Sequence, residues 1–296
     1  MAFRRTYALV AALLLALAAA GAASASWAPA KVRLPEAQRL AAGGRPVVVA
    51  VIDSGVDAGD RALRGALVPG HDFVAGDPGT ERTDSLGHGT AVAGVLAGRT
   101  PHGACPRCLV MPLRVIGASG TATPADVAAA IRWAVAAGAR VVNLSLAMAT
   151  PDPDVGAAVA DALASGVVVV AGAGNAGIDG QDWPAAYPGV ISVAGTDAHD
   201  ARETWSNYGS WVDVAAPGCN STRGARNFSV TLCGTSSATA LVSGIVALAL
   251  SHDPAATSAD VAGALAATSI PVGSFVRWGR VDATSFVRAL SAASHR

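Results

Sequence analysis

The sequence predicts an α/β protein of three layers, in which a mostly parallel sheet carries helices on both faces. The first observation is a series of short valine-rich runs without polar alternation, as expected for strands buried on both faces. The second is that helical patterns lie between these runs, an alternation typical of a doubly wound sheet. The third is a length of 296 residues with 52% hydrophobic residues, which suits one large domain.

The predicted elements follow one another along the chain. Buried-strand runs lie at 45–52, 109–115, 141–146, 167–171 and 190–194. Helical patterns lie between them at 89–98, 124–137 and 155–165. The helix at 124–137 has Thr123 as its N-cap and Gly138 after its last turn. Further along we expect a strand at 211–215, a hairpin flanked by cysteines and a helix at 236–251.

The first residues are typical of an export signal. Arg4 and Arg5 precede an uncharged run at 7–20, and the small residues at 23–25 offer a cleavage site. We therefore divide the chain into a signal peptide (1–25), a short leader (26–44) and one large domain (45–296). The alternative is an uncleaved membrane anchor, because the apolar run is nearly long enough to span a bilayer.

The cysteines agree with export. Four cysteines form an even set, as expected in an oxidising compartment, and three pairings are possible. Local pairing is the simplest, Cys105 with Cys108 and Cys219 with Cys233. A redox pair or half of a zinc site is the alternative for the first two, but no second pair of ligands accompanies them.

Three segments each place a reactive side chain at the end of a predicted strand or the start of a predicted helix. Asp53 ends the first buried strand, His88 lies immediately before a helix, and Ser236 immediately precedes the long apolar helix. Sites in open α/β sheets form outside the carboxyl ends of the strands, so these three side chains can meet.

Such a trio has a definite chemical use, although each residue alone has an ordinary interpretation as a turn, loop or cap residue. A serine hydroxyl is a poor nucleophile until an imidazole accepts its proton, and the imidazole needs a carboxylate to fix its tautomer. A helix N-terminus beside the serine adds a positive dipole end. We expect Gly87, Gly89 and Gly234 to let a substrate backbone approach closely.

The motifs Asp-Ser-Gly at 53–55, His-Gly-Thr at 88–90 and Gly-Thr-Ser-x-Ala at 234–238 resemble the active-site motifs of the subtilisin-like serine proteases (subtilases, peptidase family S8), in that family's order. The similarity extends over about 47–283. It implies a subtilisin-like catalytic domain that hydrolyses peptide bonds through an acyl-enzyme. The absence of Gly-x-Ser-x-Gly counts against an esterase or lipase.

The resemblance also implies further site residues. Asn175, within Gly-Ala-Gly-Asn-Ala-Gly at 172–177, would stabilise the oxyanion together with the Ser236 N–H. A polypeptide substrate would lie extended between two flanking segments. These segments are Gly120, Thr121 and Ala122 on one side, and Ser145, Leu146 and Ala147 on the other.

Asp182 is the candidate for selecting the residue before the scissile bond. The segment Asp182-Trp183-Pro184 resembles the base of the family's first specificity pocket, where the bond before the proline is often cis. A carboxylate there would favour Arg or Lys. The alternative is a solvated loop acid, with Asp179 as a second candidate.

The sequence departs from the family pattern in its leader. Subtilases commonly have a folding prodomain, whereas residues 26–44 are too few for a domain with its own core. Short leaders with paired cysteines also occur in the mycosins, a more limited resemblance because mycosins usually carry a C-terminal membrane span. The stretch at 96–108 is shorter than in members that bind calcium there, so we expect no metal and no cofactor.

The expected protein is a secreted monomer whose partner is its substrate, with no stable membrane span once the signal is removed. A formal net charge of zero and the absence of a basic block argue against a nucleic-acid partner. The alternative function is a non-catalytic secreted scaffold or binding protein of the same fold. Such a protein has no need to retain Asp53, His88, Asn175 and Ser236 together.

Overall fold

The computed structural model describes residues 27–77, 79–99 and 103–293, so the predicted signal peptide (1–25) lies outside the described residues. The elements in chain order are α1 (Ala28–Lys31), α2 (Leu34–Leu40), β1 (Val48–Asp53), η1 (Arg61–Leu63), β2 (His71–Asp72), α3 (His88–Ala97), β3 (Leu109–Arg114), α4 (Pro124–Ala136), β4 (Val141–Leu144), α5 (Pro153–Ala164), β5 (Val168–Gly172), β6 (Ile191–Thr196), β7 (Val214–Pro217), β8 (Cys219–Arg223), η2 (Ala225–Asn227), β9 (Ser229–Cys233), α6 (Thr235–His252), α7 (Ser258–Thr268), β10 (Gly279–Arg280) and α8 (Ala283–Ala293).

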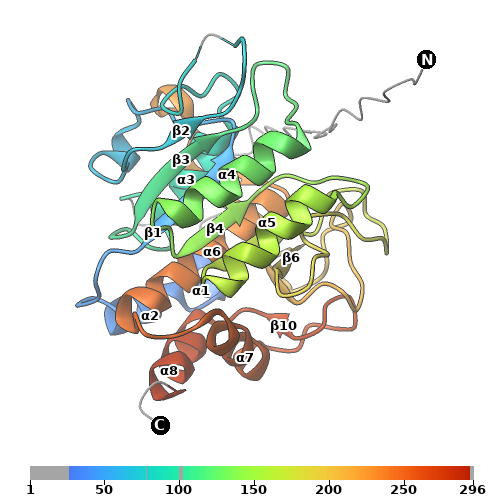
Figure 1. Cartoon of the computed structure of the whole chain (residues 1–296). Coiled ribbons are helices and arrows are strands. Elements are labelled where there is room, and N and C mark those ends of the chain that lie inside the picture. The colour runs from blue at the N-terminus through green and yellow to red at the C-terminus, as the bar shows by residue number, and fades with distance from the viewer. Residues whose placement is uncertain (1–26, 78, 100–102, 294–296) are drawn as a thin grey trace.

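A parallel sheet with helices on both faces forms the centre of the molecule, as the sequence predicts. Its strand order is β10-β7-β6-β5-β4-β1-β3-β2, and neighbouring strands run parallel. Helices α4 and α5 cover one face, and α3 and α6 pack on the opposite face (Figure 1). The separate pair β8–β9 is an antiparallel hairpin.

Strand β1 demonstrates why its sequence has no polar alternation. Val49 and Val51 belong to the core cluster that includes α3 and α6. Ala50 and Ile52 belong to the cluster on the α4 and α5 side. Both faces of the strand are therefore buried, and apolar residues are required at every position.

Helix α6 occupies the interior beneath the sheet. Among the described helices it is the one long and apolar enough to cross a membrane, but 89% of this 18-residue stretch is buried inside the protein. Its contacts with β4, β5, β6 and β7 account for that composition.

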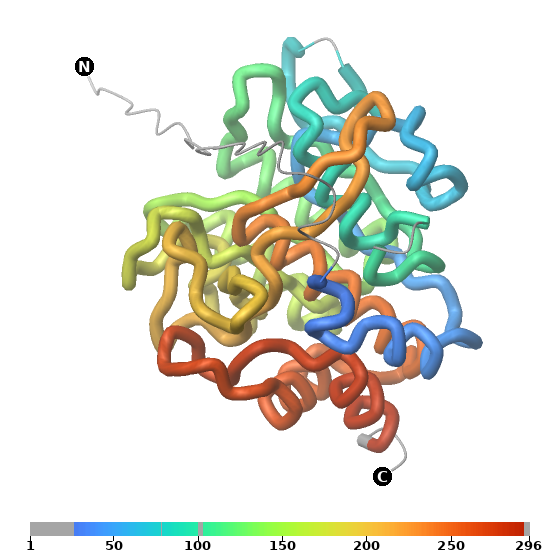
Figure 2. The backbone as a smooth tube through the Cα atoms, turned by 180° about the vertical axis from the view of Figure 1, so that it is seen from behind, coloured from blue at the N-terminus to red at the C-terminus, as the bar shows by residue number. Residues whose placement is uncertain are grey.

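The residues predicted as a leader pack into the domain. Val32 and Leu34 are buried, and the Arg33 guanidinium lies 3.2 Å from Asp282 in the turn before α8. Arg280 donates a hydrogen bond of 2.8 Å to the Lys31 carbonyl oxygen. Figure 2 shows this first described segment lying beside the C-terminal helices. Residues 27–41 are thus part of the folded body.

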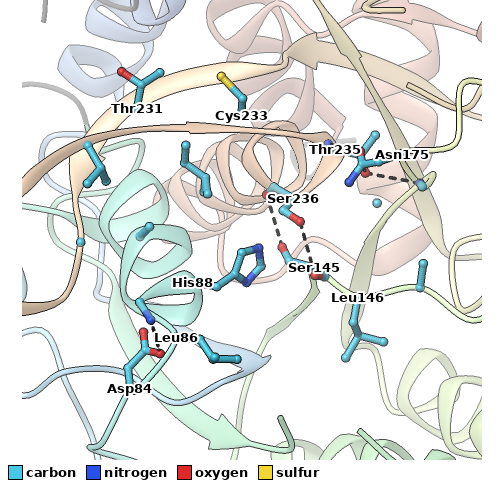
Figure 3. Close-up of a pocket in the computed structure, with 18 of the residues that line it drawn as sticks. Asp84, Leu86, His88, Ser145, Leu146, Asn175, Thr231, Cys233, Thr235 and Ser236 are labelled. Atoms are coloured by element: carbon cyan, nitrogen blue, oxygen red, sulfur yellow. Dashed lines mark hydrogen bonds between the residues drawn. The ribbon is translucent and has the colours of Figure 1, made fainter. Parts of the chain in front are cut away.

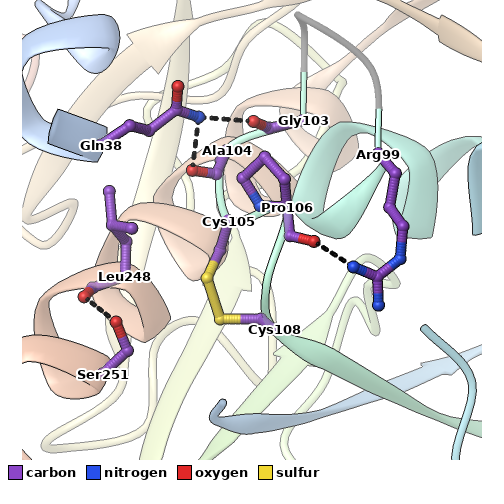
Figure 4. The surroundings of a disulfide bond; sticks show 9 residues. All are labelled: Gln38, Arg99, Gly103, Ala104, Cys105, Pro106, Cys108, Leu248 and Ser251. Atoms are coloured by element: carbon purple, nitrogen blue, oxygen red, sulfur yellow. Dashed lines mark hydrogen bonds between the residues drawn. A yellow bond between two sulfur atoms is a disulfide. The ribbon is translucent and has the colours of Figure 1, made fainter. Parts of the chain in front are cut away.

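Both predicted disulfides are present, and each joins cysteines that are close in the sequence, with separations of 3 and 14 positions. Cys105–Cys108 is buried beside α2, where the Gln38 side chain donates to the carbonyl oxygens of Gly103 and Ala104 at 2.8 and 3.1 Å (Figure 4). Cys219–Cys233 joins directly opposed residues of the β8–β9 hairpin.

The predicted elements differ from the observed ones mainly at their ends. Thr123 caps α4 by accepting from Asp126 N, as predicted. The strand expected at 211–215 begins instead at Val214, because Val212 N donates to Gly209 O in a turn before it. Helices α1, α2, α7 and α8 were not predicted from the sequence.

Candidate functional site

A cleft of about 690 Å³ contains most of the predicted site residues. His88, Asn175, Asp182 and Ser236 line it together. They come from segments far apart in the chain, which meet because the carboxyl ends of parallel strands lie at one edge of the sheet.

Asp53 and His88 are in direct contact. His88 Nδ1 lies 2.7 Å from Asp53 Oδ1 and 3.0 Å from Oδ2. Asp53 is fully buried at the end of β1, and His88, the first residue of α3, is 5% exposed. Ser54 N donates to Asp53 Oδ1 at 2.7 Å, which helps to orient the carboxylate. The carboxylate is thus placed to hold a proton on Nδ1 and leave Nε2 free to act as a base.

The environment of His88 favours its protonated form. Burial lowers the pKa of His88, but the charge of Asp53, the hydrogen bond to it and the charge of Asp84 raise it. The net result is a pKa above the ordinary value of 6.5.

Ser236 lies in the first turn of α6, next to His88 in the cleft (Figure 3). Gly234 precedes the helix with a φ of +129°, a conformation that favours glycine. Ser236 Oγ donates to the Ser145 carbonyl oxygen at 3.4 Å, and Ser145 Oγ donates to the Ser236 carbonyl oxygen at 3.3 Å. The Ser236 bond is long, so little energy opposes rotation of the hydroxyl toward the imidazole.

Asn175 lies at the other side of Ser236 with its amide oxygen engaged. Thr235 donates to Asn175 Oδ1 from its backbone N at 2.9 Å and from its hydroxyl at 3.0 Å. Asn175 itself is exposed in the cleft. Because Thr235 holds the amide oxygen, the Nδ2 group of Asn175 points away from Thr235 and can donate hydrogen bonds within the cleft.

Gly89 serves a different purpose from the one expected. A Cβ atom there would lie 2.1 Å from the Gly55 carbonyl oxygen and 3.2 Å from Asp53 Cβ. Its missing side chain therefore lets the first turn of α3 approach the end of β1. That approach brings His88 to Asp53.

Asp182 lies against the backbone that leads to Asn175. Asn207 Nδ2 donates to Asp182 Oδ2 at 3.0 Å, and a Cβ atom on Gly174 would fall 2.1 Å from that same oxygen. Burial raises the pKa of Asp182, and the bond from Asn207 partly opposes this effect. The peptide bond between Trp183 and Pro184 is cis, as the motif suggests.

The two segments expected to flank the substrate have different positions. Ser145, Leu146 and Ala147 follow β4 and line the cleft. The segment 120–122 lies between β3 and α4 and is not among the residues that line the cleft in the described part of the chain. Strands β3 and β4 lie on either side of β1, so the two segments start from opposite sides of Asp53.

Two features of this site were not predicted from the sequence. The β8–β9 hairpin lies along the cleft, which Thr231 and Cys233 help to line (Figure 3). Asp84, four residues before His88, also lines the cleft and binds the start of α3. The N-cap of α3 is Gly87 and Asp84 lies three residues before it, so the usual capping signal, an acidic residue directly before the helix, does not identify it.

The arrangement has the parts needed for nucleophilic acyl transfer. A hydroxyl at a helix N-terminus, an imidazole oriented by a buried carboxylate, and an oriented amide lie in one cleft. Among the described residues, no group of three or more His, Cys, Asp or Glu side chains is arranged to hold a metal ion.

Comparisons with known proteins agree with this geometry. Residues 44–289 match the family described as the subtilase family. Subtilisin Savinase of Lederbergia lenta is 35% identical over 265 residues, which cover 87% of this chain and 96% of that protein. Thermitase of Thermoactinomyces vulgaris is 36% identical over 273 residues, which cover 90% and 96%. The solved structure of the prenylagaramide maturation protease PagA superposes with a TM-score of 0.76 at 25% identity, covering 89% of this chain and 99% of that one.

Proposed function

Because this chain belongs to the subtilase family of serine endopeptidases, we propose that it cleaves polypeptides with Asp53, His88 and Ser236 as its catalytic triad. The contact between His88 Nδ1 and the buried Asp53 carboxylate carries the proposal. It holds the imidazole in the tautomer whose Nε2 can accept the Ser236 proton.

The reaction then follows from the positions of these groups. Ser236 Oγ attacks the scissile carbonyl carbon while His88 takes its proton, and His88 returns that proton to the leaving amine. Asn175 Nδ2 and the Ser236 N–H stabilise the oxyanion. Water, activated by the same imidazole, hydrolyses the acyl-enzyme.

Substrate lies extended along the segment Ser145–Ala147, where it can hydrogen-bond to the backbone, with the segment 120–122 on its other side. Asp182 favours Arg or Lys before the scissile bond, because its carboxylate lies on the cleft wall near Asn175. Among the described residues, no Arg or Lys forms a salt bridge with it.

A fluorophosphonate probe tests the triad. Folded protein should be labelled at Ser236, and Ser236→Ala should abolish both labelling and peptide hydrolysis. Ser237→Ala, next to the nucleophile but buried, is the matched control and should keep labelling. Absence of labelling in the folded wild-type protein would contradict the proposed function.

Export by a signal peptide at 1–25 is the second part of the proposal, with the mature protein acting as a monomer outside the cell. Two disulfides, which persist in oxidising compartments, support it. N-terminal sequencing of protein recovered from the medium should begin near Ser26. A full-length chain retained in membranes would indicate an uncleaved anchor instead.

A further inference from the structure

Asp84 lies in the loop before α3, close to His88 on the wall of the cleft (Figure 3). Its carboxylate is partly buried. Asp84 takes no part in the hydrolysis described above. Nevertheless, after Asp53 it is the second carboxylate whose charge raises the pKa of His88.

Each carboxylate oxygen of Asp84 accepts two hydrogen bonds. Oδ1 accepts from Ser54 Oγ at 2.9 Å and from Gly87 N at 2.8 Å. Oδ2 accepts from Thr90 N at 2.7 Å and from Thr90 Oγ1 at 2.6 Å. Two of these donors are backbone N–H groups at the N-terminus of α3, which have no acceptor within the helix itself. The helix dipole also favours a negative charge at this position.

The two hydroxyls are oriented toward Asp84 by their other partners. Ser54 Oγ accepts from Gly89 N at 3.0 Å, and Thr90 Oγ1 accepts from Asp57 N at 2.9 Å. Each hydroxyl still has one hydrogen atom to donate: Thr90 Oγ1 donates to Asp84 Oδ2, and Ser54 Oγ lies closer to Asp84 Oδ1, at 2.9 Å, than to Asp53 Oδ1, at 3.1 Å. Burial and the charge of Asp53 raise the pKa of Asp84, whereas the hydrogen bonds from Thr90 and Ser54 lower it and so favour the ionised carboxylate.

The same bonds join the two segments that carry the triad. Ser54 directly follows Asp53, and its hydroxyl lies 3.1 Å from Asp53 Oδ1 as well as 2.9 Å from Asp84 Oδ1. Gly87 and Thr90 flank His88 on both sides. Asp84 thus connects the end of β1 to the first turn of α3, across the contact that orients the imidazole.

We propose that Asp84 is a positioning residue for the hydrolysis. It holds the first turn of α3 against β1 so that His88 keeps its contact with Asp53, and its negative charge supports the imidazolium formed when Ser236 gives up its proton. The inference rests on the proposed function, because it requires His88 to act as the base.

The charges around His88 support this role. Burial lowers the pKa of His88, and the two carboxylates that oppose burial are Asp53 and Asp84. The other ionisable side chains that line the cleft in the described part of the chain are Asp182 and Arg226, and neither is among the main causes of the shift in the pKa of His88. Asp57, in the loop after β1, uses its carboxylate on the backbone N of Gly59 and Arg226.

Asp84→Asn tests the proposal, because it keeps the shape and removes the charge. We expect kcat/KM at neutral pH to fall roughly tenfold, by analogy with the lower end of the loss known for residues that orient metal-binding histidines. The acidic limb of the kcat/KM profile should also move to lower pH, since the pKa of His88 falls with the loss of a negative neighbour.

Asp152→Asn is the matched control. Asp152 caps α5 by accepting from the backbone N of Asp154 and Val155, and it does not line the cleft. This variant should lose some stability and keep the wild-type pH profile. Should Asp84→Asn not fold, Thr90→Val removes the hydroxyl that donates to Asp84 and accepts from Asp57 N, and leaves both carboxylates beside His88. It should lower kcat/KM by less than roughly tenfold with the acidic limb in place, and an unchanged kcat/KM would overturn the proposal.

A structural cap without influence on His88 would lower the melting temperature of Asp84→Asn and leave the acidic limb in place, and that outcome would overturn the proposal. An equal shift of the limb in Asp152→Asn would overturn it as well. Failure of the proposed function is distinct, because it would appear as a wild-type protein without hydrolysis or labelling.

Discussion

The amide oxygen of Asn175 accepts two hydrogen bonds from Thr235, the residue immediately before Ser236. One donor is the Thr235 backbone N, at 2.9 Å, and the other is its hydroxyl, at 3.0 Å. Both bonds engage the oxygen, so the asparagine cannot flip its amide without losing them. The amide N–H group is thereby oriented in advance of substrate binding, which is the condition for efficient stabilisation of a developing charge.

Asn175→Ala should reduce kcat by about 10²- to 10³-fold, the range known for the corresponding donor in subtilisin. KM should change little, because the lost bond forms mainly in the transition state. Thr235→Val keeps the backbone donor and removes the hydroxyl, so its loss should be smaller. Steady-state kinetics on a peptide substrate would measure both, and an unchanged kcat in Asn175→Ala would contradict the assignment.

The pH dependence of hydrolysis should follow His88. Burial lowers the pKa of His88, but the two nearby carboxylates raise it by more, so it exceeds 6.5. The imidazole can accept a proton only when it is neutral. Hence kcat/KM should rise with increasing pH, with an acidic limb above pH 6.5. An NMR titration of His88 in Ser236→Ala should give a matching value, and a limb below 6.5 would contradict the prediction.

Selectivity for basic residues should depend on pH through Asp182. Burial raises the pKa of Asp182, so the carboxylate becomes protonated at a higher pH than an ordinary aspartate. The preference for Arg or Lys should therefore fade as the pH falls, beginning at a higher pH than for an ordinary aspartate. Cleavage of a peptide library at several pH values would measure it.

Variants at the same site separate Asp182 from its neighbour. Asp182→Ser should remove the basic preference at every pH, whereas Asp179→Ser should leave it in place. A library profile that is unchanged in Asp182→Ser would end this interpretation, and transfer of the effect to Asp179→Ser would identify the second candidate as the selecting residue.

The disulfide at the base of the β8–β9 hairpin should contribute to stability. Cys219 and Cys233 are separated by 14 positions in the sequence. In the chain-entropy model a loop of this size contributes about 3 kcal/mol to the free energy of unfolding. Replacing both cysteines with alanine should remove about that amount, measured by urea denaturation in a Ser236→Ala background that prevents self-cleavage.

The facing pair Ser221 and Thr231 in the same hairpin provides the control. Replacing both with alanine removes a cross-strand polar pair but no covalent link, so the loss should be about 0.2–1 kcal/mol. An equal loss in the two double variants would show that the cross-link itself adds nothing.

Local sequence predicted the main elements because their causes are local. The run at 45–52 has apolar residues at every position, and the buried-strand prediction for β1 needed nothing else. Thr123, Pro124 and Gly138 mark the ends of α4 in the same way, through a side-chain cap and backbone preferences. The short helices α1 and α2 have weaker patterns, and their burial depends on tertiary contacts: α2 packs against the distant helix α8, and α1 packs against α2.

The sequence by itself determined the α/β class, the order of Asp53, His88, Asn175 and Ser236 in their motifs, and the family, because these depend on residue types and their spacing. Only the tertiary structure decided which cysteines pair, that the predicted leader packs against the C-terminal helices, and that Asp84 joins β1 to α3. It also decided that 145–147 lines the cleft while 120–122 does not. These relations depend on distances between segments far apart in the chain. Such distances arise from the register and packing of the sheet, which no local pattern encodes.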